Sequence, residues 1–200
     1  MFKKINPSPS WLVYDSNKIM HEEIKDVTFP LTDQDKEIIS KMISYVDVSY
    51  ENKADKYNIR PGIGIAAIQL GYPKKIIYIH LDDKNGEHKY LLANPKITKE
   101  STAKMYIGSG EGCLSVKKDV PGLSIRKAIV WVKGIDLFTN KEIEVKAENL
   151  LSACFQHEVD HNNNNFYYDR INENDPFYVE DQWEKICLLY TSDAADDLLC

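Results

Sequence analysis

The late part of the chain contains the sequence CFQHEVDHNNNNFYYDRI, which covers residues 154–171. Two histidines, His157 and His161, lie four positions apart, and Glu158 follows the first. On a helix, side chains at i and i+4 lie one above the other, so both imidazoles can face one metal ion with the glutamate beside them. The pattern HExxH therefore predicts a metal site, although a core helix with two hydrogen-bonded histidines is the alternative for this motif alone.

The residues before the first histidine also favour a helix. Leu150, Ala153, Cys154 and His157 fall at i, i+3, i+4 and i+7, so they share one face. We therefore expect the metal site to adjoin an apolar wall.

Two histidines do not complete a catalytic metal site, which usually has three protein ligands and one position for water. One option for the third ligand is a downstream carboxylate, with Glu173, Glu180 and Glu184 as candidates. The other option is Cys113, which lies in the glycine-rich stretch GSGEGCLS. Closely spaced glycines indicate close backbone approach, whereas a lone cysteine is often only a small buried apolar residue. The residues themselves leave both options open.

A second glycine-rich stretch, RPGIGIAAIQLG, covers residues 60–71 and places Gln69 among apolar neighbours. It is not a dinucleotide-binding fingerprint, because no strand with the required glycine spacing precedes it. Taken alone, it predicts a tight turn that enters a strand.

The composition of the whole chain favours one compact domain. The chain has 200 residues, of which 43% are hydrophobic. We assign residues 1–186 to this domain and treat residues 187–200 as a non-native tail, because CLLYTSDAADD resembles a translated sequencing adapter. Without the tail, the net charge of −6 becomes about −3.

The same trimming leaves only Cys113 and Cys154, which are too few for a disulfide framework and fit a reducing compartment. The mild charge provides no basic strip for nucleic acid or an anionic membrane. No signal peptide or bilayer-spanning run is present, so we expect a cytoplasmic protein that contacts neither nucleic acid nor membrane.

The remaining pattern predicts an α+β fold. Residues 31–50 form an expected amphipathic helix with Thr32 as its N-cap. Two expected hairpins pair residues 74–81 with 89–98 and residues 125–138 with 141–149. Strands and helices do not alternate, which argues against a parallel α/β sheet.

Three segments together resemble one protein family. GIGIAAIQ (62–69), EGCLS (111–115) and QHEVDH (156–161) occur in this order and resemble the three signature blocks of peptide deformylases, over residues 6 to 186. The GSGEGCLS run and the later DVPGL resemble the second, Gram-positive class. The resemblance implies antiparallel or mixed sheets around a central C-terminal helix that carries HExxH, with an amphipathic helix near the N-terminus.

The resemblance also implies a chemistry. Cys113, His157 and His161 would bind one divalent metal ion, Fe²⁺ in the cell, with Zn²⁺ or Ni²⁺ as alternatives. Glu158 would be the general base and acid, while the Gln69 amide and the backbone N–H of Leu114 would stabilise charge on the carbonyl oxygen. The substrates would be N-formyl-methionyl peptides of nascent chains, which yield formate and a free amine.

The same resemblance implies where the peptide lies. It would extend between two glycine-rich strands and add to a sheet edge. The expected contacts are Gly62, Ile63 and Gly64 on one side, Gly110, Glu111 and Gly112 on the other, Leu150, Ala153 and Cys154 around the methionine, and Arg126 beside the peptide backbone. An ordinary surface charge is the alternative for Arg126. We expect a monomer, with the ribosome as a candidate contact.

The chain departs from the family in two places. Ile68 stands where the family has proline, and Asn162, Asn164 and Asn165 stand at usual Leu, Gly and Ile positions. Asparagine tolerates the left-handed conformation that glycine supplies at a helix end, so Asn164 should be accepted. An inward-pointing Asn162 or Asn165 would cost roughly 1–3 kcal/mol.

Since the metal-binding pattern precedes these asparagines, we expect a working site in a less stable protein. Two alternatives remain at this point: an HExxH metallopeptidase with a downstream carboxylate ligand, and a peptide-binding relative that has lost the metal.

Overall fold

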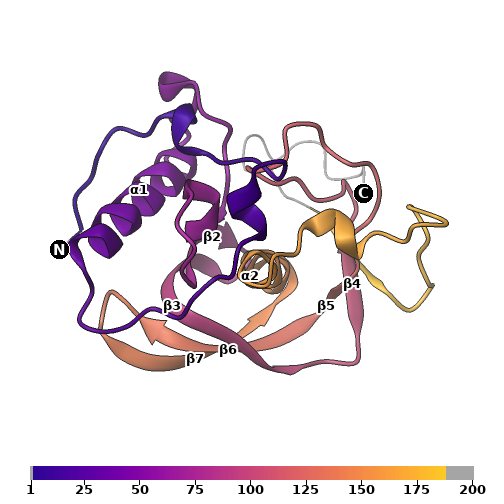
Figure 1. Ribbon diagram of the computed structural model, residues 1–200. Coiled ribbons are helices and arrows are strands. Elements are labelled where there is room, and N and C mark those ends of the chain that lie inside the picture. Colours follow the sequence, from indigo (N-terminus) through magenta and orange to yellow (C-terminus); the bar gives the residue numbers. More distant parts are fainter. Residues whose placement is uncertain (1, 188–200) are drawn as a thin grey trace.

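The computed structural model describes residues 2–187, which contain two β-sheets and two α-helices. Figure 1 shows how these elements are arranged. The α-helices are α1 (Asp33–Tyr50) and α2 (Asn149–His161). The short 3₁₀ helices are η1 (Pro9–Trp11), η2 (Lys18–His21), η3 (Asp55–Tyr57), η4 (Ala67–Leu70) and η5 (Tyr167–Arg170). The strands are β1 (Gly64–Ala66), β2 (Ile76–Asp83), β3 (Gly86–Glu100), β4 (Lys104–Ile107), β5 (Arg126–Lys127), β6 (Ile129–Asp136), β7 (Lys141–Glu148) and β8 (Glu184–Ile186).

The predicted α+β class is confirmed. One sheet has the strand order β1-β2-β3-β6-β7 and is antiparallel throughout. The other has the order β5-β4-β8, with β4 antiparallel to β5 and parallel to β8. The segment expected to be a non-native tail lies, apart from Cys187, outside the described residues.

Strand β2 is covered on both faces of the larger sheet. Alternate residues of a strand point to opposite faces. Ile77, Ile79 and Leu81 therefore join the cluster that contains Phe155 of α2, whereas Ile76 and Tyr78 join the cluster formed with α1. This double coverage explains why β2 reads as a nearly continuous apolar run rather than an alternating one.

Helix α1 begins as the sequence predicts. The Thr32 side chain accepts a hydrogen bond from the Asp35 backbone N–H, and the Asp35 side chain accepts one from the Thr32 backbone, which completes a capping box. Its predicted apolar face is buried at Ile39, Met42 and Val46. The helix thus packs against the face of β2 opposite α2.

Both predicted hairpins are present, with corrections at their ends. The turn between β2 and β3 is shorter than expected, because Asp83 pairs directly with Gly86 across Lys84 and Asn85. Gly86 has a φ of 103°, a conformation that glycine adopts at little cost. The strand expected over residues 125–138 is interrupted at Ala128, so that β5 pairs with β4 in the smaller sheet while β6 stays in the larger one.

Helix α2 lies between the two sheets and is seen nearly end-on in Figure 1. Phe155 and Val159 pack into the cluster shared with β2, whereas Ala153 joins Met105 of the smaller sheet and Ala128, which directly follows β5. The two interfaces therefore fix how the helix is rotated about its axis.

The asparagines that follow α2 differ in how well their side chains are hydrogen-bonded. Asn164 has a φ of 58°, as expected, and its side chain donates hydrogen bonds to the backbone oxygens of Met20 and Glu22. Asn162 points inward with 5% exposure, and neither polar atom of its amide has a hydrogen-bond partner among the described residues. Asn165 is only partly buried. The expected destabilising asparagine is therefore Asn162.

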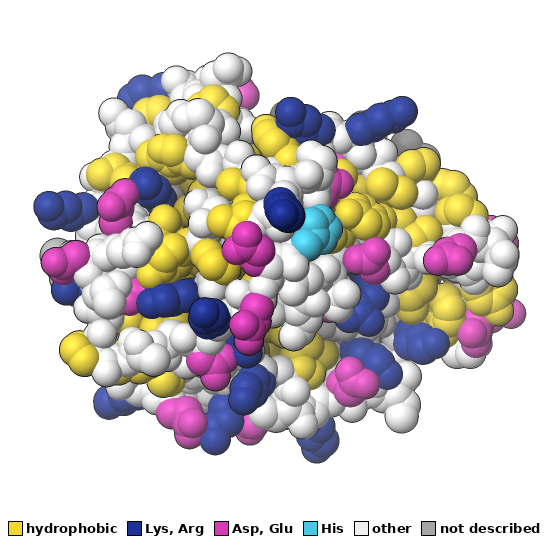
Figure 2. All heavy atoms as spheres, in the orientation of Figure 1, with side chains coloured by type: hydrophobic (Ala, Val, Ile, Leu, Met, Phe, Trp, Pro, Cys, Tyr) yellow, Lys and Arg dark blue, Asp and Glu magenta, His cyan; other side chains and the backbone are white. Residues whose placement is uncertain are grey.

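The surface carries mixed charges. On the face shown in Figure 2, basic and acidic side chains are interspersed. Within residues 2–187, the helices are all too short or too polar to cross a lipid bilayer.

Candidate metal centre

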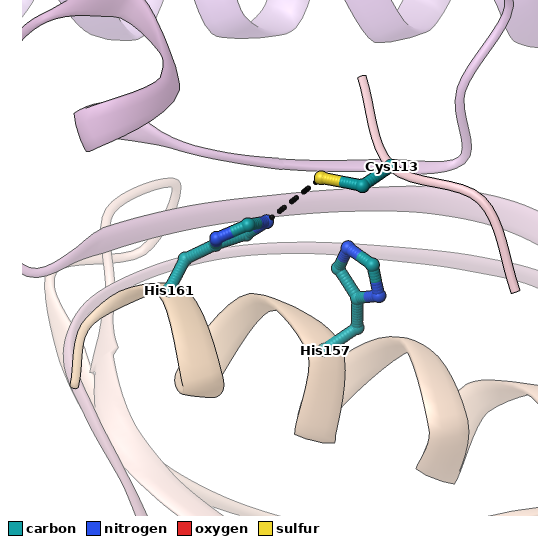
Figure 3. Close-up of side chains that lie close together, drawn as sticks. All are labelled: Cys113, His157 and His161. Atoms are coloured by element: carbon teal, nitrogen blue, oxygen red, sulfur yellow. Dashed lines mark hydrogen bonds between the residues drawn. The ribbon is translucent and has the colours of Figure 1, made fainter. Parts of the chain in front are cut away.

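Three metal-binding side chains from distant parts of the sequence converge on one point. Helix α2 supplies His157 and His161, and the loop after β4 supplies Cys113 (Figure 3). Cys113 Sγ lies 3.2 Å from His161 Nε2, and one ligand atom from each of the three residues lies within 4.8 Å of the others. An ion bound by a thiolate at about 2.3 Å and by imidazoles at about 2.0 Å holds its donors roughly 3.5 Å apart. The three side chains therefore fit a metal ion.

This geometry decides between the two options for the third ligand. Among residues 2–187, the group of His, Cys, Asp and Glu side chains able to hold a metal consists of Cys113, His157 and His161. Glu173, Glu180 and Glu184 are not part of it, and Glu173 and Glu184 are exposed. The downstream-carboxylate prediction is wrong for this structure.

Glu158 lies beside the three ligands in an unusual state. Its residue is 4% exposed, and its Oε2 atom has no hydrogen-bond partner among the described residues. Burial raises the pKa of Glu158 to about 7. A carboxyl group with this pKa can both accept and release a proton near neutral pH, as a general base must.

Gly64 makes room for this carboxylate. A Cβ atom at position 64 would lie 2.5 Å from Glu158 Oε1 and 2.9 Å from Cys154 Sγ, which is closer than real Cβ atoms come to such neighbours. Only glycine allows β1 to approach α2 this closely. The second glycine of the GIGIAAIQ block is thus explained by the position of Glu158.

His157 is oriented by a buried carboxylate. Its Nδ1 lies 2.9 Å from Glu111 Oε2, which leaves Nε2 for the metal side of the ring. Glu111 in turn receives two hydrogen bonds of 2.8 Å from Arg126 Nε and Nη2. Burial alone would raise the pKa of Glu111, but Arg126 outweighs burial and lowers it to about 2.

The charge network continues along α2. Arg126 Nη1 donates to Asp160, and Arg170 Nη2 donates to Asp160 Oδ1 at 2.5 Å. The side chains of Arg126 and Asp160 are 1% and 7% exposed. The network therefore connects Asp160 of α2 to Arg126 of β5 and to Arg170 of η5.

These contacts bear on the predicted peptide contact of Arg126. Its side chain is only 1% exposed and is paired with the side chain of Glu111, whose own expected peptide contact runs through the backbone. The Arg126 guanidinium also serves Asp160, so its donors face protein acceptors rather than a peptide carbonyl. The expected surface-charge alternative for Arg126 is wrong as well. Both side chains instead hold His157 in place.

Gln69 faces the sulfur of Cys113. Its Oε1 accepts a hydrogen bond of 2.8 Å from the Ala66 backbone N–H, which fixes the orientation of the amide. Its Nε2 then lies 3.5 Å from Cys113 Sγ. Leu114, the other expected donor, directly follows Cys113 in the loop. Ile68 is fully buried, so the departure from proline leaves Gln69 in register.

The other predicted peptide contacts lie around the same centre. Gly62 approaches Leu114, because a Cβ there would lie 2.9 Å from Leu114 Cδ1. Ile63 is 42% exposed. Residues 108–112 form a turn and loop rather than the expected strand, since β4 ends at Ile107 and Gly110 has a φ of 80°.

The expected apolar wall is divided between two clusters. Cys154 belongs to the cluster that contains Cys113, whereas Ala153 belongs to the cluster of the smaller sheet. Leu150 is partly buried and packs against both. These three side chains lie on one face of α2, as predicted, but they do not all pack into the same apolar cluster.

Sequence reasoning missed Asp160 and Arg170 as supports of the site. Asp160 is part of QHEVDH, and a charged residue between two ligands on a buried helix is a usable signal for a buried ion pair. Arg170 carries no such local signal, because its partner is brought near only by folding.

The comparisons with known proteins agree with this geometry. Residues 9–177 match the family model described as polypeptide deformylase. The chain is 77% identical over 186 residues to the peptide deformylase of Malacoplasma penetrans. This match covers 93% of this chain and 100% of the relative. It is 40% identical to peptide deformylase 2 of Geobacillus stearothermophilus, over 85% of this chain and 93% of that protein.

A solved structure supports the same conclusion. A Synechococcus elongatus peptide deformylase, crystallised in complex with actinonin, is 30% identical, with a TM-score of 0.66, and the match covers 86% of this chain and 85% of that one. The ordered motif blocks, the converging ligands and these matches lead to one conclusion: the chain belongs to the peptide deformylase family.

Proposed function

We propose that this chain hydrolyses the N-terminal formyl group of formyl-methionyl nascent peptides and releases formate. The observation that carries the proposal is the convergence of Cys113, His157 and His161 beside the buried, unpartnered oxygen of Glu158. Family membership supports the same reaction.

The three ligands would hold one divalent metal ion. When bound, this ion lowers the pKa of a water molecule and polarises the formyl carbonyl. We propose Fe²⁺ as the native ion, with Zn²⁺ and Ni²⁺ as substitutes, because this ligand set accepts all three and supply decides among them. Metal analysis of protein purified without oxygen tests this assignment. With Fe²⁺, Cys113 would be the ligand most exposed to oxidation.

Glu158 would move the proton. Its carboxylate takes a proton from the attacking water and passes it to the leaving nitrogen. The unpartnered Oε2 leaves one oxygen available for the water. Gly64 keeps the approach to Glu158 open.

Gln69 and Leu114 would stabilise the negative charge on the carbonyl oxygen. The Gln69 amide is already held by Ala66, so its N–H group needs no reorganisation when the charge develops. The backbone N–H of Leu114 would be the second donor. Loss of one such donor reduces turnover by about a hundredfold or more.

The peptide would bind along β1. This strand is the edge of the larger sheet, and an edge strand offers unpaired backbone groups to an extended peptide. Gly62, Ile63 and Gly64 would line one side of the peptide, and the loop through Gly110 and Gly112 the other. Leu150, Ala153 and Cys154 would surround the methionine side chain.

The decisive experiment measures formate release from a formyl-methionyl peptide by the iron-loaded or nickel-loaded protein. Glu158→Ala should retain the metal and lose at least about a hundredfold in kcat, since the base contributes that much. Cys113→Ala should lose metal as well as activity. Glu142→Ala, which removes an exposed carboxylate on β7, is the matched control and should retain full activity. Activity within twofold of wild type in Glu158→Ala would refute the proposed function.

A further inference from the structure

Arg60 connects the glycine-rich stretch of residues 60–71 to the loop that carries Cys113. Its Nη1 donates to the backbone oxygens of Cys113 at 3.2 Å and of Val116 at 3.0 Å. Its Nη2 donates to both carboxylate oxygens of Asp119, at 2.8 and 3.1 Å. All four hydrogen bonds therefore end on residues 113–119, although Arg60 itself lies more than fifty positions earlier.

The loop needs such a support. Residues 108–125 lie between β4 and β5 and contain no strand or helix. Within this loop, the Val116 N–H donates to the Cys113 oxygen at 3.1 Å and closes a turn. Arg60 binds the carbonyl oxygens at both ends of this turn, so it restricts the backbone on both sides of Leu114.

The approach of the guanidinium depends on glycine. A Cβ at Gly112 would lie 2.9 Å from Arg60 Nη2. The glycine directly before the metal ligand thus leaves space for Arg60, which is a role separate from peptide binding. On the other side, Gly62 contacts Leu114, so the two segments meet both through the guanidinium and through this packing.

We propose that Arg60 is a positioning residue that holds the Cys113 sulfur and the Leu114 N–H in their working orientation against residues 62–64, which lead into β1. The planar guanidinium donates four hydrogen bonds from a fixed fork, to two carbonyls and to both oxygens of one carboxylate, whereas a lysine ammonium has only three donors on one nitrogen. Asp119 is 59% exposed at its side chain, so its pair with Arg60 contributes little stability and serves mainly to orient the guanidinium. Only the expected change in kcat rests on the proposed function; the expected change in metal binding does not.

The test compares Arg60→Gln, Arg60→Lys and Asp119→Asn with wild type. The measured quantities are the absorption spectrum of the cobalt-substituted protein, the Co²⁺ dissociation constant by chelator competition, and kcat and KM for a formyl-methionyl peptide. Arg60→Gln should weaken Co²⁺ binding and lower kcat by about tenfold to a hundredfold each, with an altered thiolate-to-cobalt band. Arg60→Lys should not restore either value, and Asp119→Asn should show a smaller effect in the same direction. Lys133→Gln, which also removes an exposed positive charge, is the control. It should leave the cobalt spectrum, the Co²⁺ dissociation constant, kcat and KM unchanged.

Two outcomes would overturn the inference. An unchanged cobalt spectrum and Co²⁺ affinity in Arg60→Gln would mean that Arg60 does not position Cys113, whether or not the melting temperature falls. A raised KM with unchanged kcat and spectrum would mean that Arg60 contacts the peptide instead. If Arg60→Gln does not fold, Arg60→Lys and Asp119→Asn decide by the same criteria. If wild type fails to release formate while Arg60→Gln still weakens Co²⁺ binding, the positioning role stands and the proposed function falls.

Discussion

Asp160 and Asn162 lie two positions apart at the end of α2 and are equally buried, each at 5% exposure. Asp160 receives hydrogen bonds from Arg126 and Arg170, whereas the amide of Asn162 has no partner among the described residues. Asp160, which has partners, lies between His157 and His161 on the helix. Asn162, whose amide has none within residues 2–187, directly follows His161. In this pair, the polar group that supports the site is satisfied, whereas the one beyond the site is buried without a partner in the described part of the chain, which costs stability.

The largest effect is expected when Asp160 loses its carboxylate. Asp160→Ala should lower the free energy of unfolding by about 3 kcal/mol, because Arg126 is left buried with Glu111 as its remaining acceptor. Urea denaturation at fixed metal concentration measures the change. Asp160→Asn, which keeps the shape but not the charge, should lose less. A loss below about 1 kcal/mol for Asp160→Ala would remove the contrast with Asn162.

Asp35 on α1 extends the comparison to a satisfied carboxylate far from the metal ligands. Burial raises its pKa, but hydrogen bonds from Lys74, Thr32 and Tyr72 outweigh burial and lower the pKa to about 2. The folded state therefore binds this proton less readily than the unfolded state, whose Asp pKa is about 3.9. The stabilisation should be fully present above about pH 4 and be lost as the pH falls through about 2.

The matching measurement is the stability difference between wild type and Asp35→Asn. We expect about 2 kcal/mol at pH 7 and a clearly smaller difference near pH 2.5. An equal difference at both pH values would show that shape rather than charge explains the role of Asp35.

A gain in stability is expected at Asn162. Asn162→Leu should raise the free energy of unfolding by about 1 to 2 kcal/mol, because it replaces an unpartnered buried amide by an apolar side chain. Thermal unfolding should shift upward by about 2–4 °C per kcal/mol. Asn163→Leu is the control, since Asn163 is exposed and its side chain donates to the Val159 oxygen. A gain no larger than that of the control would indicate that Asn162 has a partner after all.

The smallest effect is expected at Asn164. Asn164→Gly removes the hydrogen bonds to Met20 and Glu22 but suits the positive φ, so the net loss should stay below about 1 kcal/mol. Asn164→Ala removes the same bonds and adds roughly 1 kcal/mol of left-handed backbone strain. The two unfolding curves should therefore separate. Coincident curves would contradict the role assigned to the backbone at this position.

The sequence was sufficient for the features that depend on local pattern. The N-cap at Thr32, the two hairpins and the histidine pair on α2 all follow from periodicity and short spacings. The ordered motif blocks also singled out Cys113, which lies with His157 and His161 in the group of side chains able to hold a metal ion. For Asn162, the sequence predicts a cost in stability only if the side chain points inward, and the sequence alone does not decide that orientation.

The contacts of Glu111 and Arg126 could not be predicted in the same way. A charged residue on a strand has no local mark that distinguishes a surface position from a buried pair. Their pairing depends on the interruption at Ala128, which moves Arg126 into the smaller sheet beside β4. Arg60 and Asp119 are likewise joined only by tertiary structure.

The position of β2 between α1 and α2 has a consequence for how the molecule opens. Both apolar clusters contain side chains of this strand, so its backbone cannot separate from β3 without exposing both clusters to water. Amide protons of β2 should therefore exchange with deuterium only through global unfolding, and far more slowly than those of the short strand β8. Such a core makes loss of the ligand geometry an all-or-none event rather than a gradual loosening.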